Sequence, residues 1–217
     1  MAEKIVIDAG HNGQTDPGAV YNGRKESDDV LKMAQAVGDI LADNGYDVEY
    51  TRTGNLDQSV IQKAQFANNA DADLFISIHR NKASYPGQYD GVQTLIYDMS
   101  GLKQVMAENI NQNLENVGYK NINVEARPDL AVLRRTRMPA LLVEVGFIDS
   151  VKDNQLFDDR FEQTAQAIAD GIMDTLNAAN PRPLYRVQVG AFYNLQNAID
   201  LEQELKRLGY NTWIVTV

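Results

Sequence analysis

Short apolar runs alternate with segments of helical periodicity over roughly the first 178 residues. Compact apolar runs predict buried strands, and apolar residues spaced three and four apart predict amphipathic helices. Strands are expected at residues 4–8, 46–52, 73–79, 92–97, 130–133 and 141–145. Helices are expected at residues 57–69, 102–117 and 161–176, and over a segment that ends at Asn44-Gly45 with the apolar face Val30, Met33, Ala34, Val37 and Leu41. This alternation predicts an α/β fold with a largely parallel sheet of about six strands flanked by helices.

The pattern changes near residue 179. Residues 179–184 are small, polar or proline and show no periodicity, which predicts a linker. Beyond it, residues 185–189 and 210–217 alternate like strands, and between them a helix carries Ala198, Leu201, Leu205 and Leu208 and ends at Gly209. This predicts a small C-terminal β-α-β appendage at residues 185–217. Because a segment below roughly 40 residues rarely folds alone, we expect it to pack on something else.

Composition narrows the chemistry of the chain. The formal net charge of −10 argues against non-specific binding of nucleic acid, because such binding needs clustered Lys and Arg. The chain has no cysteine, so any metal must be held by His, Asp or Glu. The first residues contain no apolar stretch long enough for a signal peptide or a membrane span.

Both histidines follow or end a predicted buried strand. His11 comes after the strand at residues 4–8, and His79 closes the strand at residues 73–79. Ligands of open α/β sheets bind outside the carboxyl ends of the strands, so the two imidazoles are expected to converge. Glu26 lies in the first turn of the next helix, and if it points toward His11 the set matches a catalytic zinc site. The alternative is that each histidine is an ordinary hydrogen-bonded loop residue.

Glu144 lies inside an otherwise apolar predicted strand. Burying a carboxylate is costly unless it is paired, protonated or close to a metal. One interpretation is a structural salt bridge to Arg134 or Arg135. The other is a general base with a raised pKa beside a metal-bound water.

The loop Gly10-His11-Asn12-Gly13 has a second interpretation. Glycine-rich turns at helix starts can cradle phosphate. The loop lacks the spacing of a P-loop or a dinucleotide fingerprint, so this signal is weak. The sequence also has no Gly-x-Ser-x-Gly elbow, which disfavours a serine hydrolase.

Taken together, five segments resemble the zinc N-acetylmuramoyl-L-alanine amidases of bacteria and their phages: IDAGHNG at residues 7–13, DPGAV at 16–20, Glu26, SIHRN at 77–81 and PALLVEVGFI at 139–148. The resemblance spans residues 4 to about 178 and implies that residues 1–178 form a zinc amidase domain. It implies that His11, Glu26 and His79 bind zinc and that Glu144 is the catalytic glutamate. The implied reaction is cleavage of the peptidoglycan amide between N-acetylmuramic acid and L-alanine by zinc-activated water.

The resemblance has two departures. Asn12 stands where the family usually has glycine, and Arg80 follows the second histidine where a smaller or neutral residue is common. Arg80 is expected either to meet a carboxylate of the stem peptide or to be an exposed loop residue.

The tail, from Tyr185 to Gly209-Tyr210, looks like the first half of a SPOR domain, a module that binds peptidoglycan glycan strands. The second half of such a module is absent. Self-association through residues 185–217 to give a homodimer is therefore a hypothesis.

Two other functions remain open at this point: a non-catalytic cell-wall binding protein, and a zinc peptidase that cuts within the stem peptide. In each case the expected place of action is the bacterial cell wall, outside the cell. Without a recognisable signal peptide, the sequence is expected to be released as phage lysins are or to be a processed form.

Overall fold

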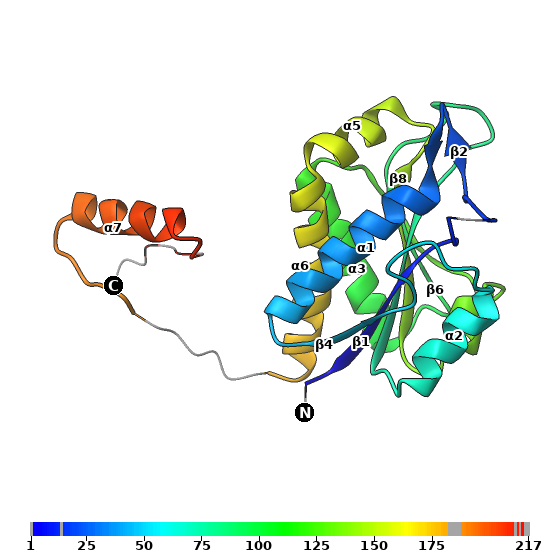
Figure 1. Cartoon of the computed structure of the whole chain (residues 1–217), viewed down its shortest axis with the longest axis horizontal. Coiled ribbons are helices and arrows are strands. Elements are labelled where there is room, and N and C mark those ends of the chain that lie inside the picture. Colours follow the sequence, from blue (N-terminus) through cyan, green and yellow to red (C-terminus); the bar gives the residue numbers. More distant parts are fainter. Residues whose placement is uncertain (1, 14, 182–187, 211, 213, 215–217) are drawn as a thin grey trace. The chain divides into compact units, whose positions relative to one another are not determined.

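The computed structural model describes residues 2–13, 15–181, 188–210, 212 and 214. The chain divides into two compact units, Met1–Pro181 and Arg182–Val217. The first unit is built on a six-stranded sheet (Figure 1), whose strands are β1 (Lys4–Ala9), β4 (Asp47–Tyr50), β5 (Leu74–Asn81), β6 (Val92–Ile96), β7 (Asn121–Ala126) and β8 (Ala140–Phe147). Their order across the sheet is β4-β1-β5-β8-β6-β7.

The sheet is largely parallel, as the alternating pattern predicted. Strands β4, β1, β5 and β8 all run in one direction, while β6 is antiparallel to β8 and β7 is parallel to β6. The carboxyl ends of β1 and β5 therefore lie side by side at one end of the sheet. At this end of the sheet, His11 follows β1 and His79 lies near the end of β5.

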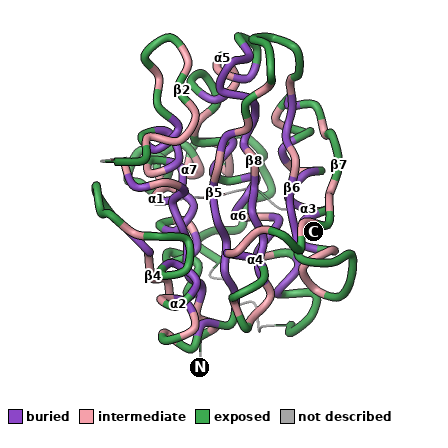
Figure 2. Tube along the Cα trace, turned by 90° about the vertical axis from the view of Figure 1, so that its right-hand side faces the viewer, coloured by how far each residue is buried: buried purple, intermediate pink, exposed green. Residues whose placement is uncertain are grey.

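Helices cover both faces of this sheet, and alternate strand residues point to different cores. The larger core joins Ile5, Ile7 and Ile76 to α1 (Glu26–Asp43), α3 (Gly101–Val117) and α6 (Phe161–Ala179). The smaller core joins Val6 and Phe75 to α2 (Val60–Asn69) and α4 (Ala131–Arg135). The four inner strands β1, β5, β8 and β6 are thus largely buried on both sides, which explains their nearly continuous apolar runs. Figure 2 shows β5, β8 and β6 as mostly buried.

Helix α2 begins later than its periodicity predicted, because Ser59 caps it. The Ser59 hydroxyl accepts a hydrogen bond from the Gln62 backbone N–H at 3.3 Å, and the Gln62 side chain accepts one from the Ser59 backbone N–H at 2.9 Å. This reciprocal pair is a capping box, which satisfies two amide groups that the first helical turn leaves without partners.

One predicted strand is wrong. Residues 130–133 belong mainly to the short helix α4, in which Val132 and Leu133 are buried in the smaller core. A four-residue apolar run cannot be assigned to a strand or to a buried helix by periodicity alone. The sixth strand is instead β7, which the pattern did not predict, and neither α5 (Val151–Asp159) nor the small antiparallel pair β2 (Val20–Tyr21) and β3 (Arg24–Lys25) was expected.

The second unit contains the predicted tail helix, α7 (Leu195–Arg207). Gly209 follows it with a φ of 89°, a conformation that favours glycine. Of the two predicted tail strands, residues 185–187, 211, 213 and 215–217 lie outside the described residues, and residues 188, 189 and 210 are not in a strand. The linker predicted at residues 179–184 begins within the end of α6, and residues 182–184 lie outside the described residues. Among the helices that are described, none is long and apolar enough to cross a membrane.

Candidate metal centre

His11 is held in an uncommon backbone conformation just beyond β1. Its φ is 58°, in the left-handed region that non-glycine residues rarely adopt. The preceding residue is fixed to the neighbouring strand, because the Gly10 N–H donates to the carbonyl oxygen of Ile78 at 3.0 Å. The His11 ring is also oriented from both sides: Nδ1 lies 2.9 Å from Asp16 Oδ2, and Nε2 lies 3.0 Å from Glu26 Oε2.

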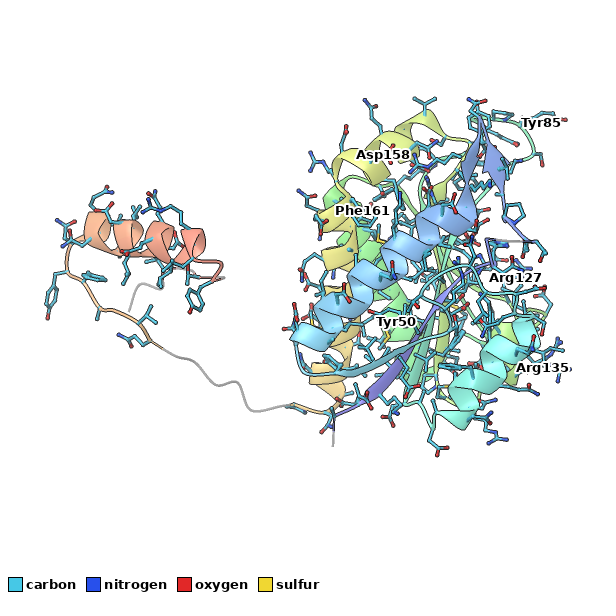
Figure 3. All side chains as sticks on the ribbon, in the orientation of Figure 1. Tyr50, Tyr85, Arg127, Arg135, Asp158 and Phe161 are labelled. Carbon is cyan, nitrogen blue, oxygen red and sulfur yellow. The ribbon has the colours of Figure 1, made fainter. Side chains whose placement is uncertain are left out.

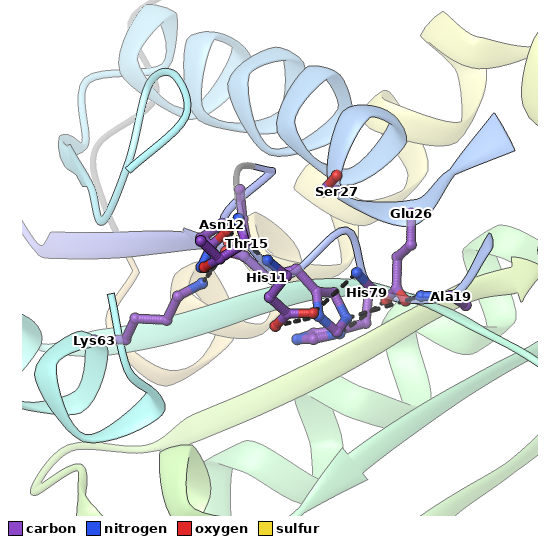
Figure 4. Close-up of polar contacts among 12 residues, drawn as sticks. His11, Asn12, Thr15, Ala19, Glu26, Ser27, Lys63 and His79 are labelled. Atoms are coloured by element: carbon purple, nitrogen blue, oxygen red, sulfur yellow. Dashed lines mark hydrogen bonds and ion pairs between the residues drawn. The ribbon is translucent and has the colours of Figure 1, made fainter. Parts of the chain in front are cut away.

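Glu26 is the first residue of α1 and its carboxylate is buried between the two histidines (Figure 4). One oxygen accepts a hydrogen bond from the Ala19 N–H at 2.8 Å, and the other accepts one from the Arg80 N–H at 2.9 Å. Burial works against ionisation, but the hydrogen bonds from His11 and His79 outweigh it. They hold the pKa of the Glu26 carboxyl well below its usual value, so Glu26 is a carboxylate at neutral pH.

His79 completes the cluster from β5. Its Nδ1 lies 3.0 Å from Glu26 Oε1, and the centroids of the two imidazole rings are 4.9 Å apart. Burial lowers the basicity of His11, yet its hydrogen bonds to Glu26 and Asp16 raise its pKa above the usual value. The two imidazoles retain exposed fractions of 22% and 19%, against 4% for the Glu26 side chain. The cluster is therefore a buried anion beneath two rings that solvent can reach.

The donor set fits a zinc ion. Each of His11, Glu26 and His79 offers a ligand atom, and these atoms all lie within 4.8 Å of one another. Two imidazoles and one carboxylate are a known ligand set for catalytic zinc, in which a further position stays open. Glycine keeps the space clear, since a Cβ at Gly10 would lie 2.5 Å from the His79 ring and a Cβ at Gly18 would lie 2.7 Å from Glu26 Oε2.

Glu144 lies on β8 directly beside His79, because these two residues are paired in the register of β5 and β8. Neither Arg134 nor Arg135 forms a salt bridge with it in the described part of the chain, which rules out the structural pairing considered from the sequence. Arg134 donates to the carbonyl oxygens of Pro128 and Asp129, and Arg135 is exposed at the periphery of the unit (Figure 3). Its Oε2 is buried and has no hydrogen-bond partner among the described residues. Burial raises the pKa of Glu144 to about 7, against the opposing charge of His79.

Proteins with similar sequences identify the family of this chain. Residues 5–174 match the family described as N-acetylmuramoyl-L-alanine amidase. The chain belongs to this family. An endolysin of Bacillus phage SPP1 is 37% identical over 187 residues, which are 82% of this chain and 67% of that protein. The sporulation-specific N-acetylmuramoyl-L-alanine amidase of Bacillus subtilis (strain 168) is 33% identical over 220 residues, covering 98% of this chain and 84% of that protein.

Solved structures of amidases share the fold of the first unit. The N-acetylmuramoyl-L-alanine amidase from Clostridium difficile 630 superposes with a TM-score of 0.74 at 27% identity, over 82% of this chain and 98% of that one. The catalytic domain of CwlV from Bacillus (Paenibacillus) polymyxa var. colistinus has a TM-score of 0.73 at 31% identity, over 81% and 98%. The predicted α/β class and the predicted membership of the N-acetylmuramoyl-L-alanine amidase family are both confirmed.

The position of Arg80 in this amidase differs from the one expected from the sequence. It was expected to contact a stem-peptide carboxylate or to be an exposed loop residue, but its side chain is buried on the far face of β5. Its guanidinium donates to Asp29 Oδ2 at 2.7 Å and to the Val145 carbonyl oxygen at 3.1 Å, and it stacks over the ring of Phe157. Adjacent strand residues point to opposite faces, so His79 and Arg80 face different surroundings.

Asn12, the other departure from the amidase pattern, fixes the loop that carries Asp16. Its side-chain oxygen accepts hydrogen bonds from the backbone N–H groups of Thr15 and Asp16, both at 2.9 Å, and its amide donates to Asp57 at 2.9 Å. The N–H groups of Asn12 and Gly13 both donate to the Asp16 carbonyl oxygen. They are not directed at an anion, which argues against the phosphate-binding interpretation of this loop.

The sequence did not reveal Asp16 as part of the centre. Its signals were its place five residues after His11 and its position at the start of the DPGAV segment at residues 16–20. A carboxylate on the second ring nitrogen of a histidine fixes the ring and its tautomer, a common arrangement around metal ligands. Asp16 therefore belongs with the candidate metal centre.

Proposed function

We propose that this chain hydrolyses the amide bond between N-acetylmuramic acid and the first L-alanine of the peptidoglycan stem peptide. The observation that carries this proposal is the convergence of His11, Glu26 and His79 beside Glu144, whose Oε2 is buried and has no hydrogen-bond partner among the described residues. The family supports the choice of bond, since its description names that amidase reaction. We infer that the chain acts on the bacterial cell wall, in keeping with an endolysin and a sporulation-specific amidase among its relatives.

His11, Glu26 and His79 would hold a zinc ion in this centre. When bound, zinc polarises the scissile carbonyl and lowers the pKa of water from near 16 toward roughly 7. Asp16 keeps the His11 ring turned so that Nε2 faces the centre. Glu26 presents an oxygen to each imidazole while backbone N–H groups fix its carboxylate, so the protein holds these ligands before zinc arrives.

Glu144 would act as base and then as acid. Its Oε2 accepts a proton from the attacking water and afterwards delivers it to the nitrogen of the departing alanine. A group does both steps well when its pKa lies near the working pH. The pKa of about 7 that burial gives Glu144 meets this condition.

The proposal is tested by metal removal. Purified peptidoglycan incubated with the full chain should gain free amino groups as the amide bonds are cut. Treatment with a chelator should abolish this release, and added Zn²⁺ should restore it. Release that persists after the metal has been removed, as verified by elemental analysis, would refute zinc dependence.

Two rival functions predict different results. A non-catalytic cell-wall binder would sediment with peptidoglycan without releasing amino groups. A zinc peptidase would release amino groups in a chelator-sensitive way, but by cutting between stem-peptide residues. The identity of the bond therefore separates the peptidase from the amidase.

The role of the tail stays a prediction. We propose, from its SPOR-like sequence, that residues 185–217 bind glycan strands or join two chains. A sedimentation measurement tests the second possibility. If the full chain sediments as a monomer, as the chain without residues 182–217 does, self-association through the tail is contradicted.

A further inference from the structure

Two buried cations lie behind the candidate metal centre. Arg52 follows β4 and Lys63 lies on α2, and each residue is only 3% exposed. Long charged side chains are seldom fully buried unless their charge is satisfied. Most of the partners of these two cations are backbone carbonyl oxygens, and all of these except Gly54 belong to the segments that carry His11 and Glu26.

Arg52 connects the segment of His11 to the first turn of α1. Its Nη2 donates to the carbonyl oxygens of Gly10 and Ser27, each at 2.8 Å, and its Nε donates to Ala9 at 3.1 Å. Gly10 precedes His11 and Ser27 follows Glu26. One planar guanidinium thus fixes the distance between the backbones of two candidate ligands.

Lys63 connects the segment of His11 to the strand of His79. Its Nζ donates to the carbonyl oxygens of Ala9 at 2.6 Å and His11 at 3.0 Å (Figure 4), and it pairs with Asp8 Oδ1 at 2.8 Å. The other oxygen of Asp8 accepts a hydrogen bond from the hydroxyl of Ser77 at 2.7 Å. Ser77 lies two residues before His79 on β5.

We infer that Arg52 and Lys63 are positioning residues of the metal centre, which set the spacing of the three ligand-bearing segments before zinc binds. This inference rests on the proposed function. His11 needs such support, because its left-handed backbone would relax to a commoner conformation if its carbonyl and that of Gly10 lost their donors. Groups that hold metal ligands in place typically strengthen metal binding by about 10-fold to 100-fold.

The test measures zinc affinity separately from folding. In Arg52→Lys the charge stays, but a single ammonium group cannot span the carbonyls of Ala9, Gly10 and Ser27. The matched control is Asn111→Ala, since Asn111 is 1% exposed and bonds to Thr94 and Asn123, on strands β6 and β7 and outside the centre. For each full-length protein, the zinc dissociation constant comes from competition with a chromogenic chelator, and the Tm is measured without zinc.

Arg52→Lys should weaken zinc binding by about 10-fold to 100-fold, the range found when groups supporting metal ligands are removed. Asn111→Ala should lower the Tm by at least as much as Arg52→Lys does, while its zinc affinity stays at the wild-type value. Wild-type affinity in folded Arg52→Lys, or equal weakening in both variants, would overturn the positioning role. A wild-type chain that binds no zinc would overturn the proposed metal centre itself.

A second variant covers the case in which Arg52→Lys does not fold. Lys63→Met is combined with Asp8→Asn, because Lys63→Met alone would leave a buried carboxylate without its cation. The double variant removes the ammonium group that donates to Ala9 and His11, and it should weaken zinc binding in the same range. If it folds and binds zinc like wild type, or if neither variant folds, the role is structural and the inference fails.

Discussion

Glu144 is an ionisable group whose surroundings allow both of its protonation states. Its carboxyl lies on an otherwise apolar strand, and burial raises its pKa to about 7, with the charges of His79 and His11 working in the opposite direction. A carboxyl in this condition can accept a proton from water and return it within one reaction. The chemistry proposed for this chain depends on that single side chain more than on any other.

Replacing Glu144 with Gln tests this role at nearly constant shape. Glu144→Gln should lower kcat by about 100-fold to 10,000-fold, the range typical of general acid and base groups. Its zinc content, measured by elemental analysis, should equal that of wild type. Glu125→Gln, on the edge strand β7 that β6 separates from β8, serves as the control and should retain activity. Near wild-type turnover in Glu144→Gln would remove Glu144 from the mechanism.

The meeting of His11 and His79 could be expected from the sequence, because parallel strands bring their carboxyl ends together. The roles of Glu26 and Glu144 followed from the family resemblance, and the zinc and catalytic roles of all four residues stay predictions. Arg80 could not be predicted in the same way. The burial of the Arg80 side chain depends on the face of β5 from which it projects and on its contacts with Asp29 of α1 and Phe157 of α5. The sequence gives no sign of partners so far apart along the chain.

Elements whose apolar run is long were predicted well, whereas short or half-exposed ones were not. Strand β7 has polar Asn121, Asn123 and Glu125 alternating with Ile122 and Val124, and it lies at the edge of the sheet. Such a segment carries little hydrophobic signal. The register that sets His79 opposite Glu144 is likewise fixed by the pairing of β5 with β8, which no local pattern specifies.

The loop after β1 leaves no room for an added methyl group. In Gly10→Ala the new Cβ would lie 2.5 Å from the His79 ring, so the ring must move away from Glu26. We expect zinc affinity and activity to fall together, by about 10-fold or more.

Gly54→Ala is the matched control for Gly10→Ala. A Cβ at Gly54 would meet no atom within 4 Å, and its zinc affinity should match that of wild type. Calorimetric titration of zinc-free protein with Zn²⁺ measures both variants. Unchanged affinity in Gly10→Ala would show that the ring tolerates displacement and would weaken the proposed ligand geometry.

At the scale of the whole molecule, Asp8 joins β1 to β5, to α2 and to the segment that follows β4. It accepts hydrogen bonds from Thr51 at 2.6 Å and Ser77 at 2.7 Å, and it pairs with Lys63 of α2 at 2.8 Å. Burial alone would raise the pKa of Asp8, but the charge of Lys63 and these hydrogen bonds outweigh burial and lower it. The ionised carboxylate therefore stabilises the folded chain.

This linkage predicts a loss of stability in acid. Because the pKa of Asp8 is lower in the folded chain, its contribution is complete above the unfolded value of about 4 and disappears as the pH falls below it. Urea unfolding of wild type should show this loss between about pH 5 and pH 2. The double variant Asp8→Asn with Lys63→Met should show a shallower decline over that interval, and equal slopes would contradict the stabilising role of the ionised carboxylate.

The central claim is the bond that the chain cuts, and mass spectrometry of digested peptidoglycan tests it most directly. We expect intact stem peptides with a free L-alanine amino terminus, together with glycan strands whose muramic acid carries a free lactyl carboxylate. Stem peptides cut between their own residues, or a digest identical to untreated peptidoglycan, would contradict it.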